Sequence, residues 1–72
     1  MDSEYFKRFY AIQFTSIKES RKDLTREQQI DLALENTQHS YYAVLERLVL
    51  QEDFYTALSA AIEFKAFLEE IK

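Results

Sequence analysis

The single histidine of the chain, His39, is followed directly by Ser40, and these two residue types could serve as the base and nucleophile of a hydrolase. Such a pair needs the two side chains within hydrogen-bonding reach of each other. If the surrounding segment is a helix, adjacent side chains diverge by about 100° and do not meet. We therefore predict that this pair is not catalytic and that the protein is not an enzyme.

Adjacent acids could supply oxygen ligands to a hard cation, and the chain has two such pairs, Glu52 with Asp53 and Glu69 with Glu70. Adjacent acids are also ordinary at the start of a helix and on a solvated last turn. The chain has no cysteine, and one histidine cannot complete a metal site by itself. We expect no metal and no cofactor.

Four basic residues gather around one segment: Lys18, Arg21, Lys22 and Arg26. Cations near the last turn of a helix are favoured by its dipole, and this is the preferred interpretation of the cluster. A small nucleic-acid-associated regulator that uses the same four residues is the alternative. The net charge of −4 disfavours it, because nucleic-acid binders usually present a basic surface, so we expect no nucleic-acid partner.

The elements that would position these residues are helices. The chain has no Gly and no Pro, so the usual residues of tight strand-connecting turns are missing. Apolar residues recur at spacings of three and four, which predicts an all-α fold in one domain over residues 1–72. We expect helices at about residues 3–21, 26–50 and 54–71, with Asp2 or Ser3 capping the first and a capping box of Thr25 and Gln28 opening the second.

A turn is predicted at residues 50–53, where the apolar pattern is interrupted and then resumes in a shifted phase. Asp53 is a good N-cap, and a fresh apolar stripe begins just after it. The members of that stripe are Phe54, Ala57, Leu58, Ala61, Phe64, Leu68 and Ile71. One continuous helix could not cover its own apolar faces, so we expect the second and third helices to form an antiparallel hairpin.

Residues from Gln51 to about Ala61 resemble the connection of two helical-hairpin families, the UVR motif of excision-repair nuclease subunits and the tetratricopeptide repeats. Both resemblances imply a helical hairpin. The role of the UVR family is not carried over, because Ser59 and Ala60 with Ala61 stand where that family continues with Arg and Asp. The segment from Thr15 to Glu19 resembles small antitoxins that obstruct Fic-type AMP-transferases, although Ser20 replaces their Gly or Asn, and it implies an antitoxin-like inhibitor as a further alternative.

The apolar surface is too broad for one copy to cover, which predicts an exposed interaction surface. The aromatics of the first helix span about 200° of its circumference, so that helix must contact more than one neighbour. A second, thinner apolar line runs along the far side of the second helix. The expected interface residues are Phe6, Phe9, Tyr10 and Phe14 of the first helix, Leu32, His39, Ala43 and Leu50 of that second line, and Tyr42 and Tyr55 at the stripe edges.

The sequence thus predicts a small non-enzymatic protein–protein interaction module, an adaptor or regulator of the kind bacteria and their phages encode. Below roughly 70–80 residues a single core rarely supplies more than about 3–5 kcal/mol, so we expect dimerisation to complete the fold. A larger protein is the expected partner. No apolar run approaches the length of a membrane span, and we expect a cytoplasmic protein without membrane contact.

Overall fold

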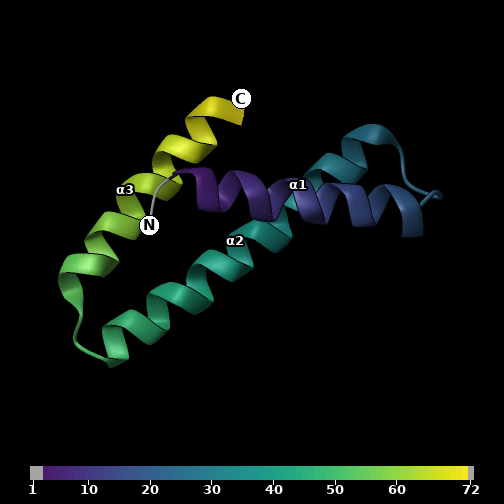
Figure 1. Ribbon diagram of the computed structural model, residues 1–72. Coiled ribbons are helices and arrows are strands. Elements are labelled where there is room, and N and C mark those ends of the chain that lie inside the picture. The colour runs from purple at the N-terminus through teal and green to yellow at the C-terminus, as the bar shows by residue number, and fades with distance from the viewer. Residues whose placement is uncertain (1–2, 72) are drawn as a thin grey trace.

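The computed structural model describes residues 3–71, and this part of the chain is all-helical, with no strand. It contains α1 (Ser3–Ser20), α2 (Arg26–Leu50) and α3 (Phe54–Ile71) (Figure 1). The predicted bounds of the second and third helices are confirmed, and the first helix ends one residue earlier than expected. The capping role expected of Asp2 lies outside the described residues.

A capping box opens α2, as predicted. The backbone N–H of Gln28 donates to Thr25 Oγ1 at 3.1 Å, and the backbone N–H of Thr25 donates to Gln28 Oε1 at 2.9 Å. The Gln29 side-chain amide donates to the Arg21 carbonyl at 3.0 Å, which fixes the end of α1 against the start of α2. Local side chains therefore set the path of the first connection.

The second connection is a Schellman turn, in which the helix end is closed by paired backbone hydrogen bonds. The Asp53 N–H donates to the Leu48 carbonyl at 2.9 Å, and the Glu52 N–H donates to the Val49 carbonyl at 3.0 Å. Glu52 has a φ of 59°, in the left-handed region that this turn usually reserves for glycine. Asp53 then caps α3, because its Oδ1 accepts the Thr56 N–H at 3.2 Å. The predicted chain reversal is confirmed.

The left-handed backbone at Glu52 leads to a stability prediction. An L-residue with a Cβ is disfavoured in this conformation by roughly 1–2 kcal/mol, and glycine avoids that cost while losing part of the gain through its more flexible unfolded chain. We expect Glu52→Gly to be more stable than Glu52→Ala by about 0.5–1 kcal/mol in thermal melts followed by circular dichroism. Both variants lack the carboxylate, so equal melting temperatures would contradict a backbone origin.

The two helices of the hairpin diverge from the turn, and the N-terminal half of α1 lies across the open side between them (Figure 1). The core forms where the three helices meet, and it consists of Phe6, Tyr41, Ala60, Phe64 and Phe67. Phe6 is completely buried and meets Tyr41 and Phe64 edge to face, with ring centroids 5.9 and 5.1 Å apart. The prediction that the first helix contacts more than one neighbour is confirmed, because α1 packs on both α2 and α3.

The buried face of α3 differs from the predicted stripe. Ala57, Ala60, Phe64 and Phe67 are buried, whereas Phe54 and Leu58, two of its expected members, are exposed. The face is rotated because α3 packs on α1 as well as on α2. Small side chains near the turn let α3 approach α2, and the two phenylalanines fill the wider space where α1 enters.

The Tyr41 hydroxyl gives a pH-dependent prediction. Tyr41 is buried and stacks on Phe64 at 4.2 Å, and this burial raises the pKa of its phenol above the ordinary value of 10.0, with the nearby Tyr42 as a lesser cause. As the pH approaches and passes the ordinary pKa of tyrosine, the unfolded chain releases this proton more readily than the folded chain, so the free energy of unfolding falls as pH rises. Between about pH 8 and about pH 11, the urea midpoint should fall further for the native chain than for Tyr41→Phe. Equal falls would contradict the prediction.

Candidate interaction surface

The side of α3 that faces away from the core is apolar. It carries Phe54, Tyr55, Leu58 and Ile62, which are 61%, 86%, 62% and 61% exposed, and we call these residues the α3 outer face. Phe54, Leu58 and Ile62 are spaced by four residues and Tyr55 lies three residues before Leu58, so the four side chains share one side of the helix. This helix is therefore apolar on two sides, a pattern typical of helices that are buried all round.

Two further apolar side chains precede the turn at the end of α2. Val49 is 46% exposed and Leu50 is 76% exposed. At roughly 150–250 Å² for a large side chain, these two and the four residues of the α3 outer face together leave on the order of 600–1,000 Å² accessible to water. The largest apolar patch of a typical monomer measures about 300–600 Å², so these six side chains together expose at least as much apolar area as such a patch.

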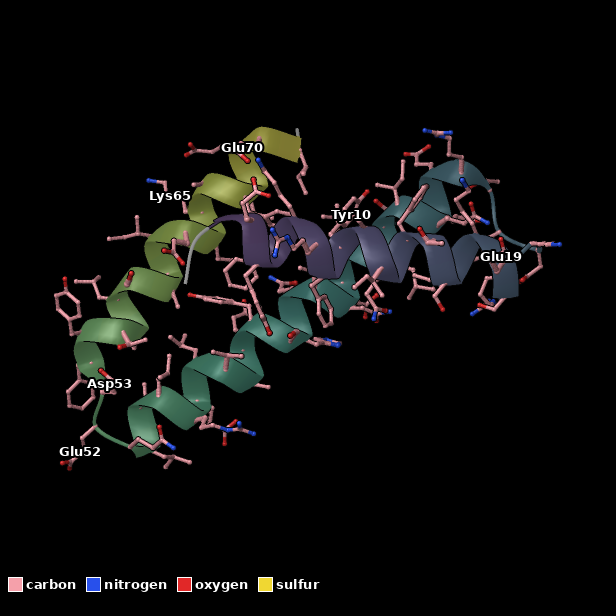
Figure 2. The ribbon with its side chains drawn as sticks, in the orientation of Figure 1. Tyr10, Glu19, Glu52, Asp53, Lys65 and Glu70 are labelled. Atoms are coloured by element: carbon pink, nitrogen blue, oxygen red, sulfur yellow. The ribbon has the colours of Figure 1, made fainter. Side chains whose placement is uncertain are left out.

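Charges of opposite sign flank the α3 outer face along the chain. Glu52 and Asp53 lie in the turn just before its first residue, and Lys65 follows Ile62 by three residues. Figure 2 shows Lys65 pointing away from α1 and α2, and Glu52 at the tip of the hairpin. Lys65 is exposed and makes no ion pair with another residue of 3–71. The line of apolar residues thus runs from the acidic turn to Lys65, and Glu69 and Glu70 follow in the last turn of α3.

The aromatic residues of α1 that were expected at an interface pack mainly against other residues of the same chain. Phe6 was expected at an interface but is fully buried in the core, since α1 inserts it between α2 and α3. Phe9, Tyr10 and Phe14 are half-buried. Tyr10 stacks on Phe14 at 6.1 Å and meets Phe67 edge to face at 6.0 Å. The outward side of α1 instead exposes Ile12, which lines two shallow depressions of that helix.

The second apolar line of α2 is divided rather than continuous. Leu32 is half-buried, and the Asn36 amide beside it on that line donates to Gln13 Oε1 of α1 at 3.0 Å. Farther along, His39, Tyr42 and Ala43 are exposed. Of the expected interface residues, only Leu50 and Tyr55 lie at the hairpin end, with Tyr55 in the α3 outer face and Leu50 at the end of α2.

Sequence reasoning missed Phe54, Leu58 and Ile62 as surface residues. Their signal was present, because they recur every fourth residue and because Leu58 and Ile62 lie on the side of a helical projection away from Ala60 and Phe64. The periodicity alone did not show which of the two apolar sides of this helix would be buried.

The basic cluster is partly occupied by local contacts. Arg21 Nε and Nη2 donate to the two carboxylate oxygens of Asp23, each at 3.2 Å, and this bonding lowers the pKa of Asp23 below its ordinary value. The Lys18 ammonium lies 5.5 Å from the centre of the Phe14 ring. Lys22 and Arg26 are exposed. The structure adds no observation that favours phosphate binding.

The residues considered for chemistry are distributed over α2, α3 and the turn between them. His39 is exposed on α2, and Glu70 forms an ion pair with Lys7 at 2.7 Å, joining α3 to α1. The Lys7 ammonium donates hydrogen bonds to the carboxylates of Glu70 and Glu4, and these bonds raise the pKa of Lys7 above its ordinary value. Among residues 3–71, no group of three or more His, Cys, Asp and Glu side chains is arranged to hold a metal ion.

The fold and surface define a small three-helix, all-α protein with an exposed apolar helix face. No protein-family model, curated protein or solved structure matches the chain. None of the helices in the described part is both long and apolar enough to cross a membrane.

Proposed function

We propose that this protein is a non-enzymatic protein–protein interaction module, an adaptor or regulator, that associates as a homodimer through the α3 outer face. The larger protein that it regulates binds this dimer. The protein acts in the cytoplasm and needs no cofactor.

The observation that supports this proposal is the size of the apolar surface at the α3 outer face, Val49 and Leu50. Its area, on the order of 600–1,000 Å², is comparable to the roughly 800 Å² that each partner contributes to a standard protein–protein interface. Burial of apolar surface is worth about 25 cal/mol per Å² before the costs of association are subtracted. A second copy offers the same apolar surface, so a two-fold contact would cover both faces at once.

A dimer would also suit an adaptor. It presents every remaining surface twice, including the exposed side of α1 around Ile12. Two linked copies of a weak contact bind a partner with two sites more tightly than either copy alone. The dimer is therefore the form that binds the partner, whereas the single chain folds but does not bind it tightly.

Sedimentation velocity of the full chain over a range of micromolar concentrations tests the proposal. We expect a species of twice 8.6 kDa that dissociates on dilution, together with a melting temperature that rises with protein concentration. A species of 8.6 kDa at every concentration, with a constant melting temperature, would overturn the proposal.

A further inference from the structure

Resting on the proposed homodimer, we infer the arrangement of its two copies. The structure assigns an antiparallel contact of α3 with the same helix of a second copy. In this contact Leu58 packs against the partner subunit's Ile62, and Lys65 lies beside the partner subunit's Tyr55 and Glu52. The occupant of the α3 outer face is thus a second copy of this chain.

The exposed residues of α3 have the spacing of a helix–helix contact. Tyr55, Leu58, Ile62 and Lys65 follow one another at intervals of three, four and three, the seam spacing of two helices that pack side by side. A two-fold axis midway between Leu58 and Ile62 brings each against the other residue of the second copy. The same axis brings Tyr55 against Lys65 at both ends of the contact.

The charges at Lys65 and in the turn favour the antiparallel direction of the two helices. An antiparallel contact places Lys65 of each helix beside the acidic turn of the other, so a lysine meets an acidic turn twice. A parallel contact would place lysine beside lysine and the acidic turns beside each other, which is unfavourable. Glu52 is the available acid, because one carboxylate oxygen of Asp53 already caps α3.

The Tyr55 ring also favours the antiparallel contact, because this contact places it beside Lys65 of the second copy. Tyr55 is 86% exposed and is the most exposed large apolar residue described. A lysine ammonium within about 6 Å of a tyrosine ring is attracted to its face, and this attraction strengthens when the pair leaves water. The antiparallel contact therefore covers the Tyr55 ring with the Lys65 side chain, whose aliphatic stem shields the apolar centre.

A charge exchange tests the charge pairing. Lys65→Glu and Glu52→Lys should each weaken the homodimer by roughly tenfold, because each replaces two attractions by two repulsions. An equimolar mixture of the two variants should form a heterodimer with nearly the native affinity. In this heterodimer each residue 65 again meets an opposite charge at residue 52: one pair is the native lysine and glutamate, and the other has the two charges exchanged. Lys22→Glu is the matched control, because it changes the net charge equally at an exposed site away from α3.

Crosslinking tests the direction of the helices, and the absence of native cysteines makes single-cysteine variants unambiguous. A mixture of Tyr55→Cys and Lys65→Cys should be joined by a short bis-maleimide, whereas each variant alone should be joined poorly. Efficient self-crosslinking of each variant, or equal weakening by Lys65→Glu and Lys22→Glu, would overturn the antiparallel arrangement while leaving a native dimer intact. A native chain that sediments only as a monomer would instead overturn the proposed function itself.

Discussion

Phe6→Ala leaves most copies of the protein unfolded at room temperature. Phe6 is the side chain through which α1 joins both other helices, since its ring is completely buried and contacts Tyr41, Phe64 and Phe67. Replacing a buried phenylalanine by alanine costs about 3–5 kcal/mol through lost burial and the cavity that remains. A core of this size supplies only about 3–5 kcal/mol in total, so one substitution removes most of the stability.

Urea denaturation followed by far-ultraviolet circular dichroism measures this effect. Ile12→Ala is a suitable control, because it removes apolar atoms from the same helix at a site that is 67% exposed. We expect that control to change the free energy of unfolding by less than about 0.5 kcal/mol. A native-like urea midpoint for Phe6→Ala would show that Phe6 does not hold the three helices together.

Ile62→Glu dissociates the proposed homodimer while the single chain keeps its fold. Ile62 is exposed on α3, so a glutamate there is solvated in the monomer and compatible with a helix. In the dimer it would be buried without a partner in each copy, a change that typically costs 2–5 kcal/mol or more per interface. We expect the dissociation constant to rise at least about 30-fold.

Ile12→Glu is the matched control for this prediction. It makes the same substitution at a comparably exposed isoleucine, but on the outward side of α1. Sedimentation velocity should show the native dimer for Ile12→Glu and a monomer for Ile62→Glu, with equal helical content. The reverse result would place self-association on α1 and would exclude the α3 outer face.

Both predictions follow from the two apolar sides of α3, one of which packs on Phe6 of α1. One side closes the fold through Phe64 and Phe67, and the other leaves Leu58 and Ile62 exposed. A substitution on the first side is expected to act on folding, and a substitution on the second is expected to act on association. The two effects are therefore separable by measuring stability and mass on the same set of variants.

The sequence by itself determined the helices and their ends, because these depend on neighbouring residues. Thr25 and Gln28 cap α2 through contacts three residues apart, and Asp53 caps α3 in the same way. The reversal before Asp53 was predictable from the interrupted apolar pattern, even though Glu52 adopts a conformation that glycine usually supplies.

Only the tertiary structure decided which apolar side chains are covered. Phe6 and Leu58 are both apolar and both lie on lines of helical spacing, yet the first is completely buried and the second is 62% exposed. Periodicity ranks the faces of a single helix, whereas burial depends on where the other two helices lie. Because α1 crosses the open side of the hairpin, it buries Phe67 and leaves the opposite side of α3 in water.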